Sequence, residues 1–205
     1  MHATPESANK HHGRDWPETE SIVALCSPDS MIAAKAERRA IPMSDSAIAS
    51  DHLNYRVVGV CVHEDHVLLH REAKDDFWVL PGGRPRLYES SRDALIREME
   101  EEISTRAEVL RLLWLVENVF EYFGERLHEI SFYYEMSLPE ESPYRDVGMD
   151  FTGQDGDVTL LFHWFPIDEI ERVRLYPTFL RTALGTLPDC PVHVIHVDQP
   201  DPPGV

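Results

Sequence analysis

Positively charged residues are scarce in this 205-residue sequence, which has 19 Lys and Arg against 37 Asp and Glu and a formal net charge of −18. An acidic surface repels nucleic-acid phosphates and anionic lipids, so we expect no nucleic-acid partner and no membrane partner. A phosphorylated small molecule would also be repelled, unless bound cations or a local basic patch reverse the field. The charge balance therefore favours a metal-loaded phosphate site over a bare one.

Cysteines and long apolar runs are also scarce. Cys26, Cys61 and Cys190 are widely spaced and contain no CxxC pair, so the sequence predicts no disulfide framework and favours a reducing compartment. No apolar run approaches the ~20 residues of a membrane span, and the N-terminus lacks the uninterrupted apolar core of a signal peptide. We therefore expect a cytoplasmic protein.

The length suits one domain with extensions and a sizeable core. Residues 1–50 are polar and mixed, and they are predicted to form a mobile N-terminal tail. Residues 51–199 form the predicted domain, and residues 200–205 a C-terminal tail. Met31 and Met43 offer alternative starts, so the sequence leaves open how much of the tail belongs to the protein.

Runs of β-branched and apolar residues predict a largely β domain. The chain from Tyr55 is expected to form a hairpin that turns at Glu64 and Asp65. Further strands are expected at Phe77–Leu80, Glu108–Glu121, Arg126–Leu138, Val158–Phe165 and Val192–Val197, and helices at Ser91–Ile103, Pro166–Ile170 and Tyr176–Leu184. Residues 139–157 are predicted to be an exposed loop. This order indicates an α+β fold, a mixed sheet covered on both faces.

The stretch from Pro81 to Thr105 contains the most informative pattern. At about 100° per residue, Glu98, Glu101 and Glu102 share one face of the predicted helix. Their charges repel one another, and a hard divalent cation would offset this repulsion. The alternative is an ordinary acidic face in solvent. The preceding Gly82 and Gly83 favour the metal site, because glycine allows the backbone to approach other groups closely.

The same stretch resembles the signature of the Nudix hydrolases, which reads Gly, five residues, Glu, seven residues, Arg-Glu, apolar, any, Glu-Glu, any, Gly, apolar. The matching positions are Gly83, Glu89, Arg97, Glu98, Met99, Glu101 and Glu102. The sequence departs from the signature at its end, where Ser104 replaces glycine and Thr105 replaces the apolar residue. The departure concerns the helix exit, because a left-handed residue there costs a non-glycine side chain about 1–2 kcal/mol.

The resemblance implies an α/β/α sandwich around a mixed sheet, with a central loop and helix that bind metal. By this resemblance, one to three Mg²⁺ or Mn²⁺ ions would be held by the carbonyl of Gly82 and the carboxylates of Glu98, Glu101 and Glu102. Arg97 would orient a neighbouring glutamate, and Glu89 would support the loop or the metal.

The candidate catalytic residues are Glu101, Glu102 and Arg97 within the motif and Glu129 outside it. Glu129 is a candidate general base, with Glu117 as the alternative, although both could be ordinary strand residues facing solvent. Substrate contacts are expected from Arg84, Arg86 and Trp78, with Arg71 as a further arginine and Phe120, Tyr122 and Phe123 as further aromatic candidates.

The resemblance implies an enzyme that hydrolyses the pyrophosphate linkage of a nucleoside diphosphate joined to another group. ADP-ribose or a nucleotide sugar is the favoured small-molecule substrate, giving a nucleoside monophosphate and a phosphorylated remainder. A nucleoside triphosphate or dinucleoside polyphosphate substrate, an isomerase, and a non-catalytic regulatory module are the alternatives. The intact Arg97–Glu98 and Glu101–Glu102 pairs favour an enzyme. A homodimer is left open.

Overall fold

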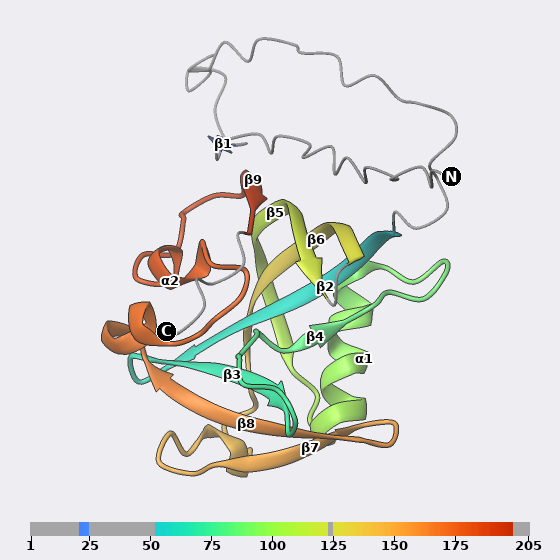
Figure 1. The fold of residues 1–205 in the computed structure, drawn as a ribbon. Coiled ribbons are helices and arrows are strands. Elements are labelled where there is room, and N and C mark those ends of the chain that lie inside the picture. The colour runs from blue at the N-terminus through green and yellow to red at the C-terminus, as the bar shows by residue number, and fades with distance from the viewer. Residues whose placement is uncertain (1–20, 25–51, 123–124, 199–205) are drawn as a thin grey trace, which may run out of the picture.

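A mixed β-sheet runs through the computed structural model, which describes residues 21–24, 52–122 and 125–198. The strand order is β1-β9-β5-β6-β2-β3-β8-β7, and the short β4 pairs with β2 (Figure 1). The strands are β1 (Ser21–Ala24), β2 (His52–His63), β3 (His66–Glu72), β4 (Gly82–Gly83), β5 (Glu108–Tyr122), β6 (Glu125–Ser137), β7 (Phe151–Asp155), β8 (Val158–Pro166) and β9 (Val192–Val197). The helices are α1 (Ser91–Ile103) and α2 (Leu180–Ala183), with 3₁₀ turns η2 (Pro143–Arg145) and η3 (Ile167–Arg172).

Two parallel pairs, β2 with β6 and β5 with β9, make the sheet mixed, because all other named pairs are antiparallel. The predicted hairpin is confirmed: β2 and β3 are joined at Glu64 and Asp65, whose φ angles of 47° and 58° suit a tight primed turn. Only Val62 and His63 of β2 pair with β3, which then pairs along its length with β8. The sheet therefore divides into two parts at the hairpin.

The helices cover opposite faces of the sheet, with α1 on one side and α2 on the other (Figure 1). Alternate residues of β2 point to the two sides, as the strand period requires. Val57 packs with Leu95 and Met99 of α1, whereas Val58 packs in a second cluster with Leu180 of α2. The expected α/β/α arrangement around a mixed sheet is confirmed.

Strand β7 lies in the segment that was predicted to be an exposed loop. It packs against α1 at Gly153, where a Cβ atom would lie 2.5 Å from the carbonyl oxygen of Glu102. Glycine permits this approach, which depends on tertiary contacts and is not visible in the local pattern. The exposed-loop prediction was wrong for β7, whereas the strands predicted at Glu108–Glu121, Arg126–Leu138, Val158–Phe165 and Val192–Val197 are confirmed within about one residue.

Other differences from the sequence predictions are smaller. Residues 77–80 form isolated bridges at Trp78 and Val79 in place of a strand. Helix α2 is shorter than the predicted Tyr176–Leu184, because i→i+3 turns from Pro177 precede it. Strand β1 falls within the predicted tail and pairs with β9, while residues 1–20 and 25–51 lie outside the described residues.

The cysteines and the helices bear on two further expectations. Cys61 is a buried free thiol, whereas Cys190 is disulfide-bonded, which the wide cysteine spacing did not predict. In the described ranges, no helix combines the length and apolar character needed to cross a membrane.

A serine caps each end of helix α1, Ser90 at the N-terminus and Ser104 at the C-terminus. Ser90 is the N-cap: its hydroxyl accepts a hydrogen bond from the Asp93 N–H at 3.1 Å and donates to the Asp93 carboxylate at 2.7 Å. At the other end Ser104 has φ 53° and ψ 34°, a left-handed conformation. The N–H of Thr105 reaches back to the carbonyl of Met99 at 3.4 Å. This is a glycine-type helix exit that is built with serine.

Substituting Ser104→Gly should therefore stabilise the protein by about 0.5–1 kcal/mol. The gain is the released left-handed strain, about 1–2 kcal/mol, less the greater backbone entropy of glycine in the unfolded chain. Urea denaturation measures it, with Ser104→Ala as the control that keeps the Cβ atom. Equal stability of the Gly and Ala variants would contradict this account of the helix exit.

Candidate active site

Two adjacent glycines bring the chain against helix α1. Gly82 has a φ of 144°, and a Cβ atom there would lie 2.1 Å from the carbonyl oxygen of Val57. A Cβ atom on Gly83 would lie 2.2 Å from the carboxyl carbon of Glu98. A side chain at either position would push β4 away from β2 or from α1. The glycines therefore place the backbone directly beside a carboxylate of the helix.

Arg97 holds this loop and helix together through five hydrogen bonds. Its Nε and Nη2 donate to the two carboxylate oxygens of Glu89, both at 2.8 Å. Its Nη1 donates to Glu98 at 2.9 Å and to Glu101 at 2.8 Å, and Nη2 also donates to the Arg84 carbonyl at 3.1 Å. Because its N–H groups are all used inside the protein, Arg97 suits the orienting role that the resemblance implies, and its place among the catalytic residues stays a prediction.

The arginine also fixes the charge of the carboxylates that it contacts. Its hydrogen bonds lower the pKa of Glu89 to about 2, against an opposing effect of partial burial. At Glu101, burial raises the pKa, but the bonds from Arg97 and Arg86 outweigh it, and the net pKa is lowered. Both groups are therefore ionised at neutral pH.

Glu102 is in a different position. Its side chain is 6% exposed, and its Oε2 has no hydrogen-bond partner among the described residues. Burial raises the pKa of Glu102 to about 8; the Arg56 guanidinium opposes the shift, and the negative charge of Glu98 adds to it. A buried carboxylate oxygen without a partner is costly, and a bound cation would remove that cost. Glu102 and its neighbour Glu98 therefore fit a hard divalent cation, with Gly82 at the same loop.

The described part of the chain holds no group of three or more His, Cys, Asp or Glu side chains already arranged around a metal position. Two of the predicted ligands have other partners: the Glu101 carboxylate accepts hydrogen bonds from Arg97 at 2.8 Å and Arg86 at 2.7 Å, and the carbonyl of Gly82 accepts one from Arg56 Nη2 at 3.0 Å. Metal binding by Gly82 and Glu101 stays a prediction, and it requires these arginines to share or release their acceptors.

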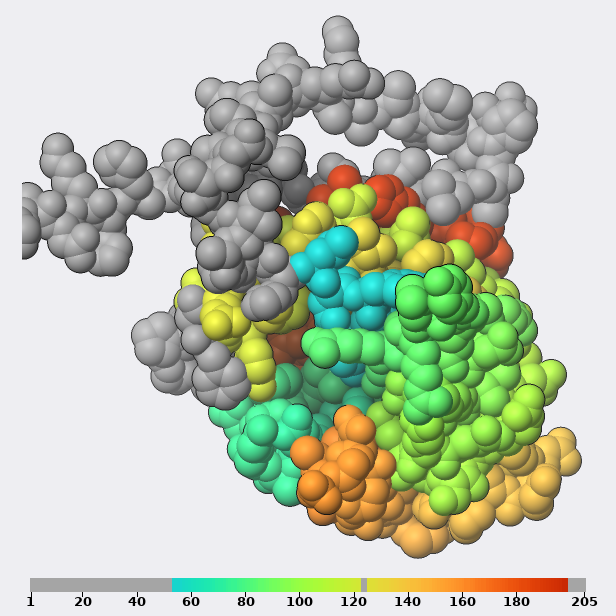
Figure 2. All heavy atoms as spheres, turned by 90° about the vertical axis from the view of Figure 1, so that its right-hand side faces the viewer, coloured from blue at the N-terminus to red at the C-terminus, as the bar shows by residue number. Residues whose placement is uncertain are grey.

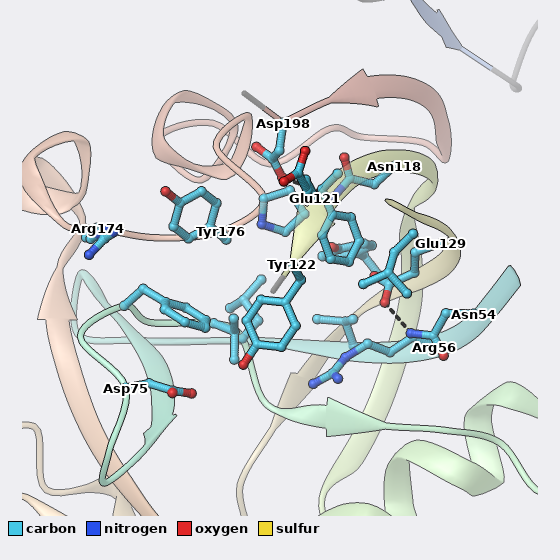
Figure 3. A pocket seen from close by; sticks show the side chains of 18 of the residues that line it. Asn54, Arg56, Asp75, Asn118, Glu121, Tyr122, Glu129, Arg174, Tyr176 and Asp198 are labelled. Carbon is cyan, nitrogen blue, oxygen red and sulfur yellow. Dashed lines mark hydrogen bonds between the residues drawn. The ribbon is translucent and has the colours of Figure 1, made fainter. Parts of the chain in front are cut away.

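Glu98, Glu101 and Glu102 of α1 form an acidic cluster, and a cavity of about 630 Å³ lies across β2 from it. Figure 2 shows a hollow on this face, between the teal segment after β3 and the yellow strand β6. Arg56, Asn54, Glu129 and Asn118 follow one another along one side, and Asp75, Tyr176 and Arg174 lie opposite (Figure 3). Arg56 and Arg84 connect the cavity to the cluster: Arg56 donates to Gly82, and Arg84 lines the cavity while its carbonyl accepts from Arg97.

A row of polar side chains crosses four strands, and its members on β2, β6 and β5 line the cavity. Asn54 of β2 is paired with Glu129 of β6, Glu129 with Asn118 of β5, and Asn118 with His196 of β9. Glu129 is buried, and it accepts hydrogen bonds from Asn54 Nδ2 at 2.5 Å and from the Ser131 hydroxyl at 2.7 Å. The alternative that Glu129 faces solvent is therefore wrong. Glu117 points to the other face of β5, where it pairs with His193 at 2.8 Å.

The structure separates the predicted substrate contacts. Arg84, Phe120 and Tyr122 line the cavity, and Arg84 donates to Asn54 Oδ1 at 2.8 Å. Trp78 lies outside it, in a smaller hollow where Arg71 stacks over its ring at 5.1 Å. Arg86 is paired with Glu101 at 2.7 Å and does not line the cavity. The structure thus places Trp78 and Arg86 outside this cavity, their substrate contacts stay predictions, and Phe123 lies outside the described residues.

Sequence reasoning missed Arg56, Asn54, Asn118 and Asp198. Arg56 and Asn54 left a weak signal, because they alternate with apolar residues at the start of a strand that is otherwise apolar. Asn118 and Asp198 are joined by a 3.0 Å hydrogen bond across 80 residues of sequence, and no local pattern announces such a pair.

The sequence model of the NUDIX domain family matches residues 53–183. A comparison with curated proteins finds no significant match. Among solved structures, the chain is similar to an ADP-ribose pyrophosphatase from Streptococcus suis, with 17% identity and a TM-score of 0.46 over 70% of this chain and 98% of that one. A MutT protein from Methanosarcina mazei is 18% identical, with a TM-score of 0.46 over 64% of this chain and 89% of that one. A UDP-X diphosphatase is 21% identical, with a TM-score of 0.42 over 64% of this chain and 56% of that one.

The acidic cluster predicts that divalent cations stabilise the folded protein. At a concentration of Mn²⁺ one hundred times its dissociation constant, the gain is about 2.7 kcal/mol, which raises the melting temperature by roughly 5–10 °C. Glu102→Gln should abolish most of this rise. Glu100→Gln should keep it, because Glu100 pairs with Arg106 at 2.9 Å on the outside of the same helix. A full rise in the Glu102 variant, measured by calorimetry, would exclude Glu102 as a ligand.

Proposed function

This chain belongs to the Nudix hydrolase family, and on that premise we propose that it hydrolyses the pyrophosphate bond of a nucleoside diphosphate linked to a second group. The products would be a nucleoside monophosphate and a phosphorylated remainder. The observation that carries the proposal is the buried, unpartnered Glu102 oxygen beside Glu98, next to a cavity of about 630 Å³ that two arginines connect to it. Such an enzyme needs carboxylates that bind the metal beside the phosphates and a separate cavity that binds the rest of the substrate.

The metal-binding residues in this proposal are Glu98 and Glu102, with Glu101 and the Gly82 carbonyl as further ligands. Bound Mg²⁺ or Mn²⁺ would neutralise phosphate charge and make a bound water more acidic. The contribution of Arg97 is to keep Glu98 and Glu101 in place and to offset their mutual repulsion. Arg56 and Arg84, at the boundary between cluster and cavity, are placed to pair with the oxygens of the diphosphate.

Glu129 is the proposed general base outside the motif. Its carboxylate is buried in the cavity wall and held from both sides by Asn54 and Ser131, so its orientation is fixed. Water adds to one phosphorus atom, its proton passes to the carboxylate, and the bond from that phosphorus to the bridging oxygen breaks. The bridging oxygen leaves with the other phosphate.

The rest of the cavity suits the nucleoside and its second group. Phe120 and Tyr122 of β5 supply aromatic faces, and Phe77 lies edge-on to Tyr122 with ring centroids 6.4 Å apart. ADP-ribose and nucleotide sugars are the favoured substrates, and a nucleoside triphosphate or dinucleoside polyphosphate is the competing class.

A substrate screen in which the nucleoside monophosphate product is separated and quantified by ion-exchange chromatography tests this function. The panel contains nucleotide sugars, ADP-ribose, nucleoside triphosphates and dinucleoside polyphosphates, each with Mg²⁺, with Mn²⁺ and with chelator. We expect turnover that chelator abolishes and that Glu102→Gln lowers at least about 100-fold, while Glu100→Gln stays near wild type. Turnover that survives chelator, or an active Glu102 variant, would contradict the proposal.

The two glutamates on β5 and β6 provide a matched test of the base. Glu129→Gln should lower kcat by about 10²–10⁴-fold with little change in KM, because general-base catalysis contributes about that much. Glu117→Gln, on the other face of the sheet, should leave kcat within about threefold. The result is read from steady-state kinetics across pH. Equal losses in the two variants would remove Glu129 from this role.

A further inference from the structure

Asn118 has an unused hydrogen-bond acceptor buried in the wall of the cavity. Its side chain is 3% exposed and lines the cavity wall (Figure 3). Its Nδ2 donates to Asp198 Oδ2 at 3.0 Å, but its Oδ1 has no partner within the described ranges. Buried polar atoms in folded proteins are almost always hydrogen-bonded, so a leftover acceptor at a cavity wall indicates a group that arrives with the ligand.

The contacts of Asp198 fix which way the Asn118 amide points. Asp198 Oδ1 accepts from the Thr178 N–H at 2.9 Å and from the Thr178 hydroxyl at 2.6 Å, and it contacts His196 Nε2 at 2.9 Å. Burial raises the pKa of Asp198, but these bonds outweigh it and the net pKa is lowered, so the carboxylate is ionised and only accepts. Asn118 must therefore turn its NH₂ group to Asp198 and its oxygen elsewhere.

The surroundings of Asn118 select against negative charge. Glu129 stands opposite Asn118 on β6, Asp198 is bonded to it, and Glu121 also lines the cavity. Burial raises the pKa of Tyr133; the Glu129 charge raises it further, the Arg56 guanidinium opposes the shift, and the Asp198 charge adds to it. A terminal phosphate placed here would meet carboxylates, whereas a neutral group with O–H donors would find acceptors.

We propose that Asn118 is a specificity residue whose Oδ1 accepts a hydrogen bond from a sugar hydroxyl of the substrate. This inference rests on the proposed function and narrows it. The hydroxyl can come from the ribose of the nucleoside or from a second sugar beyond the diphosphate, since both offer the same donor. If it comes from the second sugar, the contact selects sugar-bearing diphosphates over nucleoside triphosphates, whose terminal phosphates cannot donate there. If it comes from the ribose, which nucleoside triphosphates also carry, the contact recognises the nucleoside and does not distinguish the two classes.

The experiment pairs a change in the enzyme with a change in the substrate. kcat/KM is measured for ADP-ribose, UDP-glucose and analogues of each that lack one hydroxyl at a time on either sugar. In the wild type, loss of one particular hydroxyl should lower kcat/KM by about 10- to 100-fold, because it leaves the buried acceptor unpaired. The sugar that carries this hydroxyl distinguishes the two sources.

Asn118→Ala should lower kcat/KM for the full substrate by a similar factor and change it less than about threefold for that one analogue. Asn118→Ser, which keeps a donor for Asp198, is the second variant, and Gln154→Ala, at an exposed position of β7, is the control that should change neither value. A merely structural role for Asn118 would lower both values equally, and that result would overturn the inference. If neither variant folds, the hydroxyl series on the wild type decides.

The outcomes also separate this inference from the proposed function. If the wild type hydrolyses diphosphates but no hydroxyl loss matters more than about threefold, the Asn118 contact is refuted and the function stands. A second result would also refute the hydroxyl contact: kcat/KM depends only on the nucleobase of the substrate, and Asn118→Ala changes only the preference among nucleobases. If the wild type turns over none of the substrates, the function fails, and calorimetric binding of the same series then decides whether Asn118 contacts a hydroxyl.

Discussion

The hydrogen bonds of Arg97 are the constraint on which the site depends. One guanidinium joins Glu89 of the loop to Glu98 and Glu101 of α1, and it holds the Arg84 carbonyl as well. The helix face would otherwise be destabilised by its own negative charges. The same bonds keep Glu98 against Gly83, where no side chain could fit. Glu102 is left without such a partner and is the carboxylate most in need of a cation.

The site is built from both faces of the sheet, and this division assigns its chemistry. The acids of α1 lie on one side of β2, and the cavity lies on the other, above the apolar cluster that contains Val58 and Tyr133. Arg56 extends from β2 to the Gly82 carbonyl and so lies at the boundary. In the proposed function, phosphate chemistry and recognition of the remaining substrate thus belong to different elements, with arginines between them.

What the sequence could predict was local. The bounds of α1 follow from the Ser90 cap and from apolar residues at i+4 spacing, and the hairpin follows from its turn. The motif places its glutamates in one cluster because their spacing of three and four residues puts them on one face of the helix. The positions of Trp78 and Arg86 could not be predicted in this way, because their contacts with Arg71 and Glu101 form only in the folded chain. The polar row through Asn118 depends on strand register between distant segments, and strand β7 on a contact at Gly153.

The central claim is that Glu98 and Glu102, with the loop at Gly82, hold the cation that acts on a diphosphate. Anomalous diffraction from crystals soaked in Mn²⁺ tests it most directly. The account predicts a peak about 2.0–2.3 Å from carboxylate oxygens of both Glu98 and Glu102. Peaks confined to other acidic surfaces, with Glu102 still buried and without a partner at saturating Mn²⁺, would contradict it.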